Sequence, residues 1–193
     1  MAAPLDIPVG LPEQRRISVA EYHRMVEVGI LGEDDRVELL EGVLVAMPPM
    51  GEPHAWTLQE LNHLLIRALP DGYRVRPQLP VTLGNYSEPQ PDLAIVALRD
   101  DDPHTDHPES ALLVIEVAVS SLRYDRSAKG PVYARWGIPE YWIVDVEGRA
   151  IEVHKDPDRA GARYRVIQRL SEDETLRATQ VPIPAIEVRS ILP

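Results

Sequence analysis

Residues 112–118 read Leu-Leu-Val-Ile-Glu-Val-Ala, and residues 91–96 read Pro-Asp-Leu-Ala-Ile-Val. Each stretch is a short apolar run that carries one carboxylate, Glu116 in the first and Asp92 in the second. The apolar residues around Glu116 do not alternate with polar ones, which is typical of a strand buried on both faces. Desolvation disfavours a charged carboxylate in such a strand unless a cation lies beside it. If the two strands pair, Asp92 and Glu116 meet at one end of a sheet and form an oxygen site suited to Mg²⁺.

The composition is that of a globular chain. Its 193 residues suit one domain, and 44% of them are hydrophobic, which is enough for a sizeable core. The formal net charge of -11 argues against a general polyanion-binding surface, but it leaves room for a local basic groove or for carboxylates offset by a metal. The absence of Cys excludes disulfides and zinc held by sulfur. No apolar stretch has transmembrane length and no secretory signal pattern is present, so we expect a cytoplasmic protein with no membrane partner.

The sequence before the two apolar runs predicts helices and a hairpin. Ser18-Val19-Ala20-Glu21 has the pattern of a capping box, which predicts a helix from Ser18 to about Val28. Glu41-Gly42 lies between two short apolar runs and predicts a hairpin turn. Apolar residues at helical spacing predict a second helix over 53–69. Short strands are predicted over 73–75 and 79–83.

Further elements are predicted after the two runs. Residues 99–110 are acidic and indicate an exposed connection, and 120–124 indicate a polar linker. A helix is predicted from about Asp125 to Trp136, closed by Gly137. Strands are predicted over 141–144, 151–154 and 164–167. Because strands and helices do not strictly alternate, we expect an α/β (mixed α+β) protein whose central mixed sheet has helices on its faces. Residues 1–16 are expected to form an extended arm, and 17–193 a single domain.

Four motifs point to a known family. They are Val37-Glu38-Leu39-Leu40-Glu41-Gly42, Pro91-Asp92, Ile115-Glu116-Val117 and the run 137–145, Gly-Ile-Pro-Glu-Tyr-Trp-Ile-Val-Asp. Together they resemble the Uma-two family of the restriction-endonuclease-like superfamily, whose signature is Pro-Asp followed later by an acidic residue, any residue and Lys. The resemblance runs from about Ser18 to Val153. It implies a central mixed sheet with Asp92 and Glu116 on adjacent strands, and metal-dependent cleavage of phosphodiester bonds.

The chain departs from the signature at one position, because Ala118 stands where the superfamily has Lys. In the Uma-two pattern this Lys lies on the following helix, where the chain has Lys129. The implied catalytic residues are Asp92, Glu116 and Lys129, with Glu38 and Glu41 as candidates for a further carboxylate. Asp92, Glu116 and Glu38 are the candidate ligands for Mg²⁺, with Mn²⁺ as the alternative ion.

Three further residues are candidates for contacts at this site. His54 opens the second predicted helix, where it could contact metal-bound water or substrate. Gln78 is a candidate donor to a substrate phosphate. Arg126 lies one turn before Lys129 and could share its role.

Each candidate also has a purely structural interpretation that the sequence leaves open. Asp92 would then satisfy loop amides at the start of a strand, and Glu116 would belong to a buried salt bridge. Lys129 would be an exposed partner of Asp125 at spacing i, i+4. Tyr133 would be a core residue. The remaining polar candidates would be solvated surface groups, namely Glu38, Glu41, His54, His104 and His107.

Two functions therefore stand side by side. The first is a magnesium-dependent endonuclease acting on nucleic acid, with DNA favoured over RNA. The second is a degenerate nuclease fold that serves as a binding or oligomerisation module. The acidic composition favours the second, and the joint presence of Asp92, Glu116 and Lys129 favours the first. Because two-fold dimers are the commonest oligomers, we also expect a homodimer, with the arm at residues 1–16 reaching the partner.

Overall fold

A six-stranded mixed sheet forms the centre of the computed structural model, which describes residues 15–32, 34–98 and 107–193. The strand order is β3-β4-β5-β6-β7-β8. Strands β5 and β6 are parallel, and the other neighbouring pairs are antiparallel. The bounds are β3 (Tyr73–Pro77), β4 (Leu93–Ala97), β5 (Leu113–Ala118), β6 (Glu140–Asp145), β7 (Ala150–Asp158) and β8 (Arg163–Ser171). Every residue of β5 and β6 is buried, so the absence of alternation correctly indicated strands covered on both faces.

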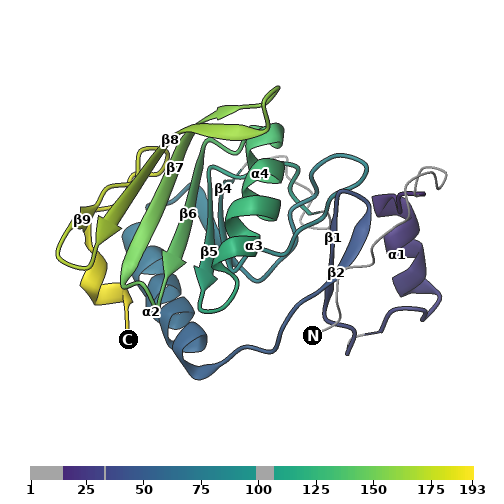
Figure 1. Ribbon diagram of the computed structural model, residues 1–193, viewed down its shortest axis with the longest axis horizontal. Helices are drawn as coiled ribbons and strands as arrows, with labels where there is room; N and C mark the ends of the chain where they lie inside the picture. Colours follow the sequence, from purple (N-terminus) through teal and green to yellow (C-terminus); the bar gives the residue numbers. More distant parts are fainter. Residues whose placement is uncertain (1–14, 33, 99–106) are drawn as a thin grey trace.

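Helices cover both faces of this sheet (Figure 1). On one face, α2 (Glu52–Ala68) packs Leu58, Leu61 and Leu65 against the inward side chains of β4 and β5. On the other face lies a continuous helical segment formed by α3 (Leu122–Tyr124), the π-helix η1 (Asp125–Lys129) and α4 (Gly130–Trp136). The predicted mixed α/β fold is therefore confirmed.

The N-terminal part lies at one end of the molecule (Figure 1). It comprises α1 (Val19–Glu27) and the hairpin of β1 (Val37–Leu40) and β2 (Val43–Ala46). The capping box at Ser18 and Glu21 is present, as predicted. At the opposite end, the chain closes with β9 (Thr175–Leu176), β10 (Ile186–Glu187) and the 3₁₀-helix η2 (Val188–Ile191).

Two element predictions were wrong. Residues 79–83 do not form a strand, apart from an isolated bridge between Leu83 and Ser87. Pro80 interrupts this stretch and cannot donate to a ladder, and Val81 instead donates its N–H to the carbonyl of Pro89. The predicted polar linker over 120–124 contains α3, so the helical segment begins earlier than expected. It ends at Gly137, where φ is 76°, as the sequence predicted.

Some predictions fall on residues that the structure does not describe. Apart from Arg15 and Arg16, the predicted arm lies outside the described residues, and so do His104 and most of the acidic connection over 99–110. Within the described ranges, no helix combines the length and the hydropathy needed to cross a membrane.

Candidate active site

Pairing between β4 and β5 brings Asp92 and Glu116 to the same place. Leu93 lies opposite Ile115 in this antiparallel register, so Asp92, one residue before β4, lies opposite Glu116. Asp92 Oδ2 also accepts the backbone N–H of Val117 at 2.8 Å. This bond fixes the Asp92 carboxylate against β5, and the condition for a shared site, that the two strands pair, is met.

Lys129 reaches Glu116 from the helical segment on the second face of the sheet. It is 6% exposed, and its Nζ lies 2.9 Å from Glu116 Oε1 and 3.3 Å from Glu38 Oε2. Burial opposes the charge of this ammonium, but the charges of Glu116 and Glu38 outweigh burial and raise the pKa of Lys129. Lys129 is therefore a buried cation at Glu116, and the interpretation as an exposed partner of Asp125 was wrong.

Tyr133 is a second donor to Glu116 that the sequence interpretation missed. Its ring is fully buried, as a core residue should be, but its hydroxyl donates to Glu116 Oε1 at 2.8 Å. Lys129 and Tyr133 thus converge on one oxygen, and no described residue donates to the other oxygen, Oε2. The spacing i, i+4 on the helical segment was the only signal that could have linked the two residues.

The environment of Glu116 disfavours its charged form. Burial raises the pKa of this carboxyl well above its usual value, and the neighbouring charges of Asp92 and Asp125 act in the same direction. The ammonium of Lys129 opposes this shift without cancelling it. A further cation beside Glu116 would restore the ionised carboxylate.

Glu38 comes to the site from the hairpin. It is 2% exposed, and its Oε2 accepts the backbone N–H of Gln90 at 3.0 Å. Its Oε1 accepts the hydroxyl of Tyr124 at 3.3 Å. Glu38 turns inward, so it is not a solvated turn residue, but its oxygens are held by protein donors that include Lys129.

His54 contacts Asp92 from the first turn of α2. The two side chains are 19% and 13% exposed, and His54 Nε2 lies 3.0 Å from Asp92 Oδ2. His54 Nδ1 is buried without a hydrogen-bond partner among the described residues. The structure therefore places His54 beside Asp92 rather than on the surface.

Two predicted site residues lie elsewhere. Glu41 occupies the hairpin turn at φ 52°, where it pairs with Arg16 and Arg135, and it does not line the site. Arg126 pairs with Glu152 on β7, with Nε 2.9 Å from Oε2. In the π-helix the hydrogen bonds span five residues, so a residue three positions before Lys129 does not lie beneath it.

Gln78 and His107 have simpler placements. Gln78 adopts φ 49° and donates its backbone N–H to the carbonyl of Asp92 at 3.0 Å, which holds it in the wall beside the site. His107 lies edge-on to the ring of His23, with 6.4 Å between the ring centroids. Neither side chain contacts Glu116 in the structure.

A cavity of about 510 Å³ lies at this site, and Gln78 is part of its lining. Four carboxylates and one ammonium face it, so its polar wall carries an excess of negative charge. Asp125, which the sequence interpretation treated only as a surface partner of Lys129, is 2% exposed and accepts the hydroxyl of Ser121 at 2.6 Å. The charged lining residues are Glu38, Asp92, Glu116, Asp125 and Lys129, and His54 lies among them.

The donor set fits a hard divalent cation. Mg²⁺ binds carboxylate oxygens and keeps several waters, so one or two carboxylates suffice. Asp92 Oδ1 and Glu116 Oε2 accept no hydrogen bond from the part of the chain that the structure describes. Among the residues described, no group of three or more His, Asp or Glu side chains is arranged to hold a metal ion. Two carboxylates completed by water and substrate is the arrangement that these residues allow.

Comparisons with known proteins agree with the fold. The family model described as "Uma2: Putative restriction endonuclease" matches residues 19–188. A crystal structure from Anabaena variabilis, titled as that of "a putative nuclease belonging to DUF820", has a TM-score of 0.71 at 13% identity. The match covers 91% of this chain and 97% of that one. No curated protein matches the chain. At this identity the structural likeness shows a shared fold.

Proposed function

Because the chain belongs to the Uma2 family, we propose that it is a metal-dependent endonuclease that hydrolyses phosphodiester bonds in nucleic acid. The observation that carries the proposal is the position of Lys129. Its ammonium lies 2.9 Å from Glu116 in the cavity that Asp92 shares, although residue 118 of the chain is Ala. A buried cation beside two convergent carboxylates is the set of groups that phosphodiester hydrolysis needs.

The proposal gives each residue a role. Asp92 and Glu116 would hold Mg²⁺ or Mn²⁺ through Asp92 Oδ1 and Glu116 Oε2. When bound, such an ion lowers the pKa of a coordinated water and offsets negative charge on the phosphate. Lys129 orients the attacking water and stabilises the charge that develops on the phosphate oxygens.

Two residues position the others. His54 holds Asp92 at Oδ2, which leaves Oδ1 toward the cavity. Glu38 forms an ion pair with Lys129 and accepts hydrogen bonds at both of its oxygens, so it is a positioning residue rather than a metal ligand. We extend the proposal to DNA in preference to RNA, in keeping with the description of the family. We also propose that the protein is a homodimer.

The test is a cleavage assay on matched DNA and RNA oligonucleotides with Mg²⁺ or Mn²⁺. We expect cleavage of DNA that stops when the ion is chelated and that Asp92→Asn abolishes. RNA cleaved faster than DNA of the same sequence would overturn the DNA preference. If no DNA or RNA is cleaved with either ion, the endonuclease proposal fails and the binding-module function replaces it.

A further inference from the structure

The cavity has one wall that hydrolysis of the phosphate does not use. Residues 45–51 comprise the end of β2 and the connection to α2, and they line the cavity together with the carboxylates. None of these residues carries a charge. Met47 is partly buried and Met50 is 36% exposed, and two prolines lie between them. The cavity is therefore lined by charged side chains and by an uncharged, mainly apolar run over 45–51, which we call the apolar wall.

With the divalent cation of the proposed function bound between Asp92 and Glu116, the cavity would have cations for one phosphate and not for several. Proteins bind duplex DNA through many contacts between Lys or Arg and successive phosphates. Among the described residues that line this cavity, Lys129 is the one Lys or Arg, and four carboxylates surround it. A duplex lying across the opening would bring further phosphates close to these carboxylates. The lining thus favours entry of a single phosphate group over docking of a duplex face.

The size and the apolar wall together suit one nucleotide. A volume of about 510 Å³ is within the range of small-ligand sites. Bases inside a duplex are stacked and paired, so their faces cannot contact a side wall unless they leave the stack. An unpaired base presents both faces, and packing against flat or apolar side chains is how proteins bind single strands without reading their sequence.

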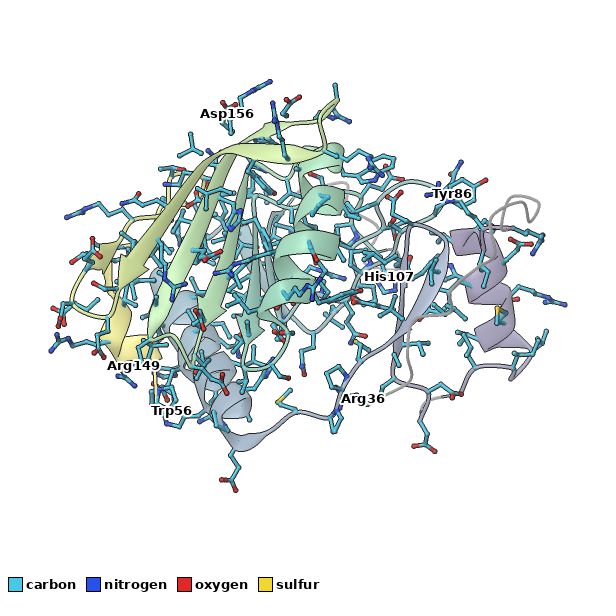
Figure 2. The ribbon with its side chains drawn as sticks, in the orientation of Figure 1. Arg36, Trp56, Tyr86, His107, Arg149 and Asp156 are labelled. Atoms are coloured by element: carbon cyan, nitrogen blue, oxygen red, sulfur yellow. The ribbon has the colours of Figure 1, made fainter. Side chains whose placement is uncertain are left out.

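A cation beside the apolar wall favours a strand over a free mononucleotide. The backbone N–H of Met47 donates to the carbonyl of Arg36 at 2.8 Å, and the Arg36 side chain is exposed. Figure 2 shows Arg36 at the end of the hairpin where the segment toward α2 begins. Because the Arg36 backbone lies beside Met47, the Arg36 guanidinium can bind the phosphate of the next nucleotide in a strand.

We propose that the cavity binds one unpaired nucleotide of a single-stranded nucleic acid, with its base against Met47 and Met50 and its phosphate between Lys129 and the Asp92–Glu116 pair. The substrate class is then single strands, including unpaired strand ends, rather than duplex. The assignment of the phosphate position rests on the proposed function. The assignment of the base position rests on the apolar wall.

The experiment compares a fluorescently labelled single strand with a blunt duplex of the same sequence, at one salt concentration. Binding is measured by anisotropy with Ca²⁺ in place of Mg²⁺, and the strands are checked afterwards to be intact. We expect the single strand to bind about tenfold more tightly than the duplex, the scale of one stacked base. Met47→Glu should weaken single-strand binding about tenfold, because it removes apolar contact and adds a carboxylate near the phosphate.

Met25→Glu is the matched control, since Met25 is also partly buried but lies on α1 and does not line the cavity. It should leave binding unchanged. Met50→Glu, at a more exposed position, repeats the test if thermal unfolding shows that Met47→Glu does not fold.

Equal binding of duplex and single strand overturns the inference, as does full binding by a folded Met47→Glu or Met50→Glu protein. Absence of binding to either nucleic acid overturns it as well. Cleavage with Mg²⁺ or Mn²⁺ is measured separately on the same strands. If the single strand is bound with the expected preference but not cleaved with either ion, the single-strand preference and the base position stand, and the endonuclease proposal fails.

Discussion

Lys129 supplies the positive charge beside Glu116 that Ala118 cannot supply. Ala118 points its methyl group into the core of the second face, whereas Lys129 brings an ammonium to Glu116 from the helix packed there. A long, flexible side chain allows a change of element without a change in the position of the charge. The cation at this site is therefore defined by packing of the helical segment on the sheet, not by spacing along β5.

Replacing Lys129 with methionine removes the charge and keeps most of the stem. We expect Lys129→Met to slow single-turnover cleavage about a hundred- to a thousandfold, or ~3–4 kcal/mol, the effect of removing one preorganised charge. The fold should persist, because Glu116 can take up a proton when its cation is removed. Lys155→Met is the control, since Lys155 lies 3.7 Å from Glu140 and does not line the cavity. Parental cleavage by Lys129→Met would assign Lys129 a structural role only.

The Tyr133 hydroxyl is expected to control which oxygen of Glu116 faces the cavity. Tyr133→Phe deletes one buried hydrogen bond to Oε1, so Glu116 is less firmly oriented. We expect the affinity for Mg²⁺, measured by calorimetry, to fall about fivefold, the equivalent of ~1 kcal/mol for a neutral hydrogen bond.

Tyr164→Phe is the matched control for this change. Tyr164 is also buried, and its hydroxyl donates to the carbonyl of Ile138 at 2.9 Å, away from Glu116. Both variants should lose a similar amount of stability, but only Tyr133→Phe should lose affinity for Mg²⁺. An equal loss of affinity in the two proteins would contradict the positioning role.

Glu38 helps to attach the β1–β2 hairpin to the rest of the fold, in addition to the backbone bridge between Leu39 and Glu88. This carboxylate accepts hydrogen bonds from Gln90 in the loop before β4 and from Tyr124 on α3, and it forms an ion pair with Lys129 on η1. The hairpin itself forms a separate two-stranded sheet. One buried side chain therefore joins the hairpin to the loop before β4 and to the helical segment, which are far apart in the sequence.

Removing this carboxylate should loosen the hairpin. We expect Glu38→Ala to lower the free energy of unfolding by about 1–3 kcal/mol, because it leaves buried donors without an acceptor. Amide hydrogen exchange should quicken across residues 37–46 before it changes in β5. Glu41→Ala, in the same hairpin but in partly exposed ion pairs, should cost less than about 1 kcal/mol. Equal exchange rates in the two variants would show that Glu38 does not fasten the hairpin.

Stability, pH and metal binding are coupled through Glu116. The pKa of this carboxyl lies above its usual 4.5 because of burial. A group whose pKa is higher in the folded state stabilises the fold below its unfolded pKa and loses that contribution as the pH rises through the folded pKa. In urea unfolding, we therefore expect the stability of Glu116→Gln relative to the parent to increase as the pH rises from 4.5 toward neutral.

Binding of Mg²⁺ should reverse this cost and release a proton. A metal ligand must be ionised, so the affinity for Mg²⁺ should rise with pH, and calorimetry in buffers of different ionisation enthalpy should detect the proton. Mg²⁺ should also raise the unfolding temperature of the parent but not of Asp92→Asn. Asp156→Asn, an exposed carboxylate on β7 (Figure 2), is the control and should respond like the parent. A pH-independent affinity would exclude Glu116 as a ligand.

The surface around α1 supports the proposed homodimer. None of the residues of this helix is buried, and the apolar residues near its end are 51–64% exposed, namely Val26, Val28 and Ile30. We expect light scattering at micromolar concentration, without substrate, to give the mass of a dimer, and Ile30→Glu to give a monomer. Ile167→Glu on β8, where the residue is 59% exposed, should remain dimeric. A monomeric parent protein would contradict the proposal.

The sequence by itself determined the central strands and the caps, and it singled out Asp92 and Glu116 as carboxylates that meet if their strands pair. These features depend on local physics. A strand buried on both faces must be apolar throughout, a capping box satisfies its own helix end, and Gly137 adopts a positive φ at low cost. A carboxylate inside such a strand stands out because its desolvation needs compensation.

Only the tertiary structure decided which side chains complete the site. Glu38 and Glu41 belong to one hairpin, but Glu38 faces the cavity and Glu41 forms ion pairs with arginines at the surface. Arg126 and Lys129 belong to one helical segment, but Lys129 faces the cavity and Arg126 pairs with Glu152. The π-turn that sets the direction of Lys129 has no clear sequence signature. Tyr133 and Asp125 occur in helices of many kinds, so their presence did not indicate a contact with the site. Their partners come from other strands and helices, and the direction of a side chain toward a distant partner is set by how those elements pack, not by the residues beside it in the chain.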